Sequence, residues 1–396
     1  MSLPCHIPFG VYVTYANGSG GAGGSPAESL SSVTYAYDHL GRLVSDGGVA
    51  YAHDAAGNRT ARNDGAATTS YALGAGDRLA SWTGDSGGGT YAYDAAGNVT
   101  RIGRDGRPTL DLAWNGRYQL VSVSTNGAFA EGYAYDALGR RVSTTTAEGT
   151  VRHVYDDRWQ VVADIGAQGD VIASYVWGEG IDSLLAVKVG GESYYPLADI
   201  QGTVWGYADA ANNIVARWTY DAWGNVLDEE VSVPALATLR YRFQGREWSA
   251  ATGLVNFRMR WYDPETGRWL SKDPIGLSGG LNLYCFCMDA PILYVDPTGE
   301  LSPAVAVGVG IGVAYLGYII YRHFNKVKQK MDSADIDDLR DVANKMIDCT
   351  EDTMATVTPL FGPPMPDTTL PLTDKATEVL VRPLWRRVFD QIRPSE

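Results

Sequence analysis

The chain has 396 residues, of which 45% are apolar, so it is long and hydrophobic enough to build a core. Its formal charge of −14 argues against a nucleic-acid-binding surface over the main body, because neutralising phosphates requires clustered Lys and Arg. The four cysteines include no C-x-x-C pair and the five histidines are scattered, so the sequence predicts no disulfide framework, no metal site and no cofactor.

The first 32 residues are predicted to be a short strand followed by a linker. FGVYVTYA at 9–16 reads as the strand, and NGSGGAGGSPAESLSS at 17–32 has the composition of a flexible linker. The opening MSLPCHIPFG has neither the basic nor the apolar region of a secretory signal. Either the natural N-terminus lies elsewhere, or export uses another route.

Residues 33–240 carry an internal repeat with a period near twenty residues. Aromatic residues recur at spacings of 20 or 21, and the consensus reads Tyr-x-Tyr-Asp-x-x-Gly-Asn/Arg-x-Val/Leu. The clearest copies begin at Tyr35, Tyr51, Tyr91, Tyr133 and Trp218.

Each repeat has a direct physical interpretation. Tyr-x-Tyr places two rings on one strand face, aspartate caps a turn by accepting backbone N–H bonds, and glycine supplies the left-handed conformation. Two short strands and two turns per repeat predict a mainly β fold, in which a spiralling antiparallel sheet forms a partial β-shell. Tyrosine counts 24 against 8 for phenylalanine, which favours half-buried rings whose hydroxyls reach water or backbone.

The segment 241–300 contains three Asp-Pro turns, at Asp263, Asp273 and Asp296. The structural interpretation is that proline restricts the preceding residue and that Asp, Pro and Gly together bend the chain between short strands. Asp263, inside YDPETG, is expected to be the standard repeat turn.

The catalytic interpretation is self-proteolysis by paired carboxylates. Two aspartates in a dry site share one proton, so that one activates water while the other protonates the carbonyl or the leaving amide. The candidates are Asp273 and Asp296, with Asp289 close by in sequence. Four arginines of the same segment could bind carboxylates, although solvated strand-edge arginines are the commoner case; they are Arg246, Arg258, Arg260 and Arg268.

Taken together, the repeats and the Asp-Pro segment resemble the Rhs/YD-repeat family, with 241–300 similar to the Rhs repeat-associated core domain. The resemblance covers about 33–300. It implies a hollow β-shell that encloses a variable C-terminal polypeptide, commonly a toxin, and a core domain that plugs one end. Many such proteins cut themselves after P-x-x-x-x-D-P-x-G-L by an aspartyl-type mechanism. Pro291 to Gly299 match this motif, but Glu300 stands at the leucine position, so the cleavage region Gly299, Glu300 and Leu301 departs from the pattern.

The segment 301–330 changes the character of the chain. Residues 303–321 are uncharged and mostly apolar, contain a G-x-x-x-G pattern and precede a basic flank. They predict a transmembrane helix with the C-terminal tail cytoplasmic. Packing within or beside the shell, and a buried strand, are the alternatives. Residues 331–396 are predicted to be a variable, short α-helical region without a catalytic constellation.

Two main functional hypotheses follow. The first is an Rhs-family shell or carrier protein of a polymorphic toxin system, secreted or at the cell surface, whose partner is an immunity protein or a secretion apparatus. Autoproteolysis near residue 300 would be its one enzymatic activity. The second is a membrane-anchored YD-repeat protein that binds carbohydrate or a neighbouring cell. An inactive remnant of a longer Rhs protein is a third interpretation.

Overall fold

A computed structural model describes residues 10–16, 30–85 and 87–300. The predicted apolar segment 303–321 and the helical region 331–396 lie outside the described residues. Within the described residues, no helix is long and apolar enough to cross a membrane. The strand predicted at 9–16 is confirmed as β1 (Gly10–Ala16), whereas the linker predicted to end at residue 32 gives way to a strand at Leu30.

In the described part of the chain, 21 strands form one antiparallel sheet in which each strand pairs with the strands before and after it in sequence. The strands are β1 (Gly10–Ala16), β2 (Leu30–Tyr37), β3 (Leu43–Asp46), β4 (Val49–His53), β5 (Arg59–Asn63), β6 (Thr68–Leu73), β7 (Leu79–Gly84), β8 (Gly87–Tyr93), β9 (Val99–Arg104), β10 (Arg107–Trp114), β11 (Leu120–Thr125), β12 (Ala128–Tyr135), β13 (Arg141–Thr146), β14 (Gly149–Tyr155), β15 (Val161–Ile165), β16 (Val171–Trp177), β17 (Leu184–Val189), β18 (Glu192–Ala198), β19 (Val204–Ala208), β20 (Ile214–Tyr220) and β21 (Val226–Val231). The predicted antiparallel YD-repeat sheet is therefore confirmed.

The repeat turn works as its residue types predict, and Asp94 illustrates it. The Asp94 carboxylate accepts backbone N–H bonds from Gly97 and Asn98, each at 2.8 Å, and a side-chain bond from Asn98. Gly97 has φ +98°, in the left-handed region that glycine adopts without steric cost. A register shift between Ala92 and Tyr93 precedes the aspartate, and this bulge turns the strand into the corner.

Aromatic side chains tie each repeat to the one before it. Tyr135 donates its hydroxyl to the carbonyl of Leu120 at 2.8 Å, and Trp114 donates its indole N–H to the carbonyl of Val99 at 2.7 Å. Both acceptors lie at the start of a strand in the preceding repeat. A phenylalanine has no donor for this bond, which explains the preference for tyrosine.

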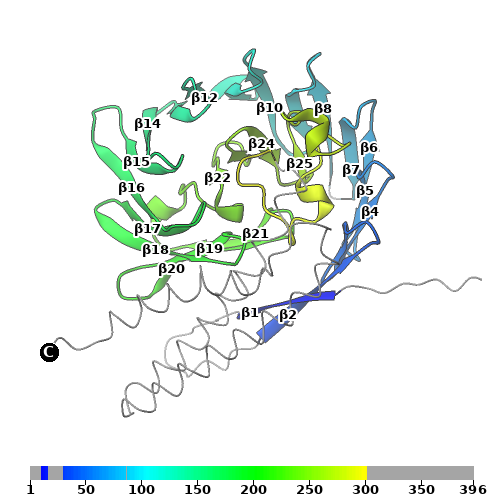
Figure 1. Ribbon diagram of the computed structural model, residues 1–396, viewed down its shortest axis with the longest axis horizontal. Helices are drawn as coiled ribbons and strands as arrows, with labels where there is room; N and C mark the ends of the chain where they lie inside the picture. Colours follow the sequence, from blue (N-terminus) through cyan, green and yellow to red (C-terminus); the bar gives the residue numbers. More distant parts are fainter. Residues whose placement is uncertain (1–9, 17–29, 86, 301–396) are drawn as a thin grey trace, which may run out of the picture. The chain divides into compact units, whose positions relative to one another are not determined.

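The segment after β21 forms a second, four-stranded sheet and several 3₁₀ turns. Figure 1 shows β22, β24 and β25 lying inside the curve of the large sheet. Three hydrophobic clusters mix residues of both parts; for example, Trp223 of the large sheet's last turn packs with Trp269 and Phe286. These elements are β22 (Glu247–Trp248), β23 (Val255–Phe257), β24 (Arg260–Asp263), β25 (Arg268–Trp269), η1 (Pro234–Leu236), η2 (Phe243–Gly245), η3 (Gly276–Gly279) and η4 (Cys287–Asp289).

The turn glycine Gly224 packs directly against this inner segment. It has φ +89°, and a Cβ there would lie 2.5 Å from the ring of Phe243. We expect Gly224→Ala to reduce the free energy of unfolding by about 2–5 kcal/mol through backbone strain and overpacking. Gly41, with φ +78° and no atom near its Cβ position, is the matched control. Gly41→Ala should cost about 1 kcal/mol, from strain alone. Equal losses for the two variants in urea unfolding would contradict this packing.

Candidate active site

Two of the three candidate aspartates meet at one arginine. Nη2 of Arg260 lies 3.0 Å from Oδ2 of Asp273 and 3.2 Å from Oδ2 of Asp296. Arg260 opens β24, Asp273 follows β25, and Asp296 lies beyond η4, so the small sheet and its turns bring the three together. All three residues are buried, which strengthens their electrostatic interaction.

The acids in this cluster outnumber the base. Burial raises the pKa of Asp273; Arg260 opposes this rise and Asp296 adds to it. Burial also raises the pKa of Glu300, and the neighbouring Asp273 carboxylate raises it further. Because a single guanidinium faces three carboxyl groups, the cluster retains a proton more readily than isolated acids do. A retained proton is what general acid catalysis requires.

The predicted cleavage region contacts the same cluster. Nε of Arg260 donates to the carbonyl oxygen of Gly299. The N–H groups of Gly299 and Glu300 donate to Oδ1 of Asp296, at 2.9 and 3.0 Å. Gly299 has φ +74°, and a Cβ there would lie 2.5 Å from the carbonyl oxygen of Phe257, so only glycine fits. Leu301 lies outside the described residues.

Asp289, the third candidate, is held elsewhere. Its Oδ1 lies 3.9 Å from Nε2 of His53 in β4. Burial raises the pKa of Asp289 to about 7, against the opposing hydrogen bond of the Cys285 thiol. Burial lowers the pKa of His53 to about 4, so His53 is largely uncharged near neutral pH, whereas Asp289 is about half ionised there. The fold therefore pairs Asp289 with the sheet and not with Arg260.

The expectation that the four arginines are solvated is wrong. The side chains of Arg246 and Arg258 are 2% and 7% exposed and both bind Asp182 at 2.7 Å, while Arg260 binds the two aspartates described above. Arg268 is also buried and donates to Oδ1 of Asn58 at 2.9 Å. A guanidinium inside the sheet must find acceptors, because an unpaired buried charge is costly.

Asp263 does more than bend the chain. Its Oδ1 accepts the backbone N–H of Glu265, as the turn interpretation predicts. Its Oδ2 accepts the hydroxyl of Tyr91 at 2.6 Å and binds Arg104 at 2.7 Å. The same carboxylate thus closes a turn and fixes the inner segment to β8 and β9.

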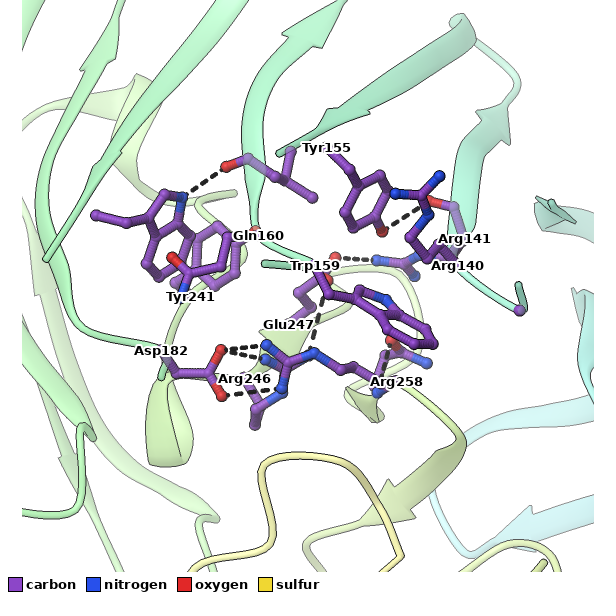
Figure 2. A pocket seen from close by; sticks show the side chains of 14 residues that line it. Arg140, Arg141, Tyr155, Trp159, Gln160, Asp182, Tyr241, Arg246, Glu247 and Arg258 are labelled. Carbon is purple, nitrogen blue, oxygen red and sulfur yellow. Dashed lines mark hydrogen bonds and ion pairs between the residues drawn. The ribbon is translucent and has the colours of Figure 1, made fainter. Parts of the chain in front are cut away.

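Figure 2 shows a pocket between the repeat turns and the inner segment, lined by Arg141 and Tyr155 from the sheet and by Arg246, Glu247 and Arg258. The cavity volume is about 10 Å³, room for roughly one water molecule. Ion pairs between the lining side chains occupy the surrounding space and connect the sheet to the inner segment. The pocket therefore has no room for a substrate. Asp182 and Glu247 were not predicted from the sequence, because Asp182 binds Arg246, 64 positions later, and Glu247 binds Arg141, 106 positions earlier.

Comparison with known proteins decides the family. The family model of the teneurin YD-shell matches residues 27–286. The chain belongs to the YD-shell family. The predicted resemblance to Rhs/YD-repeat proteins is therefore confirmed, because the match spans the repeats and most of the segment that follows them.

Several YD-shell relatives are named as toxins or nucleases. Toxin protein Tse5 of Pseudomonas aeruginosa is 30% identical; the match covers 72% of this chain and 26% of that protein. The tRNA3(Ser)-specific nuclease WapA of Bacillus spizizenii is 32% identical over 54% of this chain and 9% of its own length. A crystal structure of TcdB2-TccC3 without its hypervariable C-terminal region is 19% identical, with a TM-score of 0.40 over 69% of this chain and 18% of that chain. The chain thus spans about a quarter or less of these proteins.

Proposed function

We propose that this chain is the YD-shell portion of a toxin protein and that it cleaves its own backbone at the Arg260–Asp273–Asp296 cluster. The observation that carries the self-cleavage proposal is the placement of one buried guanidinium between two carboxylates and the Gly299 carbonyl. An arginine held between two buried carboxylates is not needed to bend the chain, since backbone turns already do so.

The toxin-shell role is supported by family membership and by relatives named as toxins, including Tse5 and toxin subunit YenC1 of Yersinia entomophaga. On this proposal the protein is secreted or delivered with its toxin, and its partners are other toxin components, a secretion apparatus or an immunity protein. The carbohydrate-binding alternative has less support, because five of the tyrosines that could stack on sugars are buried; they are Tyr35, Tyr51, Tyr71, Tyr133 and Tyr175.

The proposed reaction is hydrolysis of one peptide bond in the Gly299–Leu301 region. Asp296 takes a proton from a water molecule, whose oxygen attacks the carbonyl carbon. Arg260 donates to the Gly299 carbonyl oxygen, where negative charge develops as the tetrahedral intermediate forms. Asp273, whose pKa is raised, donates its proton to the departing amide nitrogen as the C–N bond breaks. The products are a new carboxylate and a new amine.

The wild-type chain tests this proposal. Purified protein incubated over a range of pH should yield fragments of roughly 300 and 96 residues on a denaturing gel. The rate should fall as pH rises through the raised pKa of Asp273, because the general acid then loses its proton. Intact mass spectrometry locates the cut. A chain that stays intact at every pH, or is cut outside the Gly299–Leu301 region, would contradict the proposal.

A further inference from the structure

The position of Asp296 depends on a short arm of chain that contains no strand. Residues 291–295 connect the 3₁₀ turn η4 to Asp296 without ladder hydrogen bonds of their own. Two glutamine side chains supply the missing bonds. Nε2 of Gln201 donates to the carbonyl of Pro291 at 2.6 Å, and Nε2 of Gln244 donates to the same carbonyl at 3.2 Å.

Gln244 makes further bonds along the arm. Its Nε2 also donates to the carbonyl of Tyr294 at 3.1 Å, and its Oε1 accepts the N–H of Asp296 at 3.4 Å. The Gln244 side-chain amide thus hydrogen-bonds to the start of the arm, near its end, and to the backbone of Asp296. An amide uses both its donor and its acceptor capacity here, which neither a carboxylate nor an apolar side chain of similar size can do.

The backbone of Gln244 has an unfavourable conformation at this position. Its φ and ψ are +48° and 33°, in the left-handed region that residues with a Cβ rarely adopt, and its side chain is buried. Its backbone N–H donates to Oγ1 of Thr203 at 3.0 Å. A strained residue persists only where its surroundings enforce it, and such residues concentrate at functional sites.

Thr203, which accepts the Gln244 N–H, belongs to a repeat turn of the large sheet, as does Gln201. Gln201 and Thr203 lie between β18 and β19, and Oδ1 of Asp199 accepts the N–H of each at 2.9 Å. The consensus turn therefore presents Gln201 to the arm and Thr203 to Gln244. Through these contacts, the large sheet is connected to Asp296, which lies beside Arg260.

We propose that Gln244 is a positioning residue for self-cleavage, and that the 199–203 turn makes cleavage conditional on docking of the inner segment against β18 and β19. The inference rests on the proposed self-cleavage. Its consequence is an ordered sequence in which the sheet folds, the arm is seated by Gln201 and Gln244, and only then does Asp296 complete the cluster. Cutting before the shell is assembled is thereby avoided.

The test is the rate of self-cleavage in variants that keep side-chain volume but remove the amide. Gln244→Met should lower the rate constant about 10- to 100-fold, because a shift of about 1 Å in a catalytic group has effects of this size. Gln201→Met should lower the rate in the same direction, by less, since one of two bonds to Pro291 is lost. Cleavage is followed over time in a cell-free translation at several pH values.

Gln160→Met is the matched control. Gln160 is also buried and follows a repeat-turn aspartate, but its amide donates to the carbonyl of Gly180, away from the arm. The self-cleavage rate of Gln160→Met should match that of the wild type. Thermal melting of cleavage-blocked versions of all three variants shows whether each is folded; if Gln244→Met is not, Gln201→Met carries the test.

The pH profile separates positioning from mere destabilisation. Asp273 is faced by Arg260, Asp296 and Glu300, and the charge on Asp296 helps to raise its pKa. Displacing Asp296 removes that contribution, so the midpoint of the rate profile should move to lower pH in Gln244→Met but not in Gln160→Met. A wild-type rate and midpoint in both arm variants would overturn the inference while leaving self-cleavage intact. A wild-type chain that is never cut would overturn the proposed function instead.

Discussion

Replacing Asp273 or Asp296 by asparagine should leave the chain at its full length of 396 residues. Asparagine keeps the shape of the side chain but neither gives nor takes the proton that each carboxyl group transfers in the proposed reaction. General acid–base catalysis contributes about 10²- to 10⁴-fold in rate, so either substitution should slow cleavage by at least that range. The fraction of intact chain on a denaturing gel, followed over hours, measures the effect.

Asp289→Asn is the matched control for these two variants. Asp289 is an equally buried aspartate of the same segment, but its neighbours are His53 and Cys285. Its substitution should leave the cleavage rate unchanged. If Asp289→Asn blocked cleavage while Asp273→Asn did not, the wrong pair of acids would have been assigned.

Glu247→Ala should reduce the free energy of unfolding by about 3–5 kcal/mol, since it strands buried arginines without a counter-charge. Oε2 of Glu247 binds Nη1 of Arg240 at 2.9 Å and also contacts Nη2 of Arg141. A loss of this size corresponds to a fall in Tm of about 10 °C for a domain of this length. Differential scanning calorimetry measures it.

The same carboxylate makes stability depend on pH. Burial opposes ionisation of Glu247, but the guanidiniums of Arg141 and Arg240 outweigh it and lower its pKa. Its contribution to stability is therefore present above the pKa of an unfolded glutamate, about 4.3, and is lost as pH falls through the lower folded value.

The control for Glu247→Ala is Glu192→Ala, at an exposed position of β18, which should change stability by less than about 0.5 kcal/mol. Similar losses in the two variants would show that the buried network adds little.

The large sheet was predictable because its information is local. The aspartate of each repeat bonds to residues two to four positions ahead, and the glycine that follows adopts the left-handed conformation within the same turn. Hairpin turns also fix which strand pairs with which, so a meander of short strands follows from the repeat alone. The turn role of Asp263 was predictable for the same reason.

The partners of the charged residues were decided only by the tertiary structure. The sequence named Asp273 and Asp296 as candidates, with Asp289 close by in the chain, but only the fold shows that the first two meet at Arg260 while Asp289 lies beside β4. Sequence reasoning also assigned the arginines no distant partners, although Arg246 binds Asp182, 64 positions earlier. Such contacts depend on how far the twisted sheet curves before the inner segment packs against it, and that angle accumulates over many strands. Local hydrogen-bonding rules determine each corner of the chain, but the accumulated curvature determines which corners face one another.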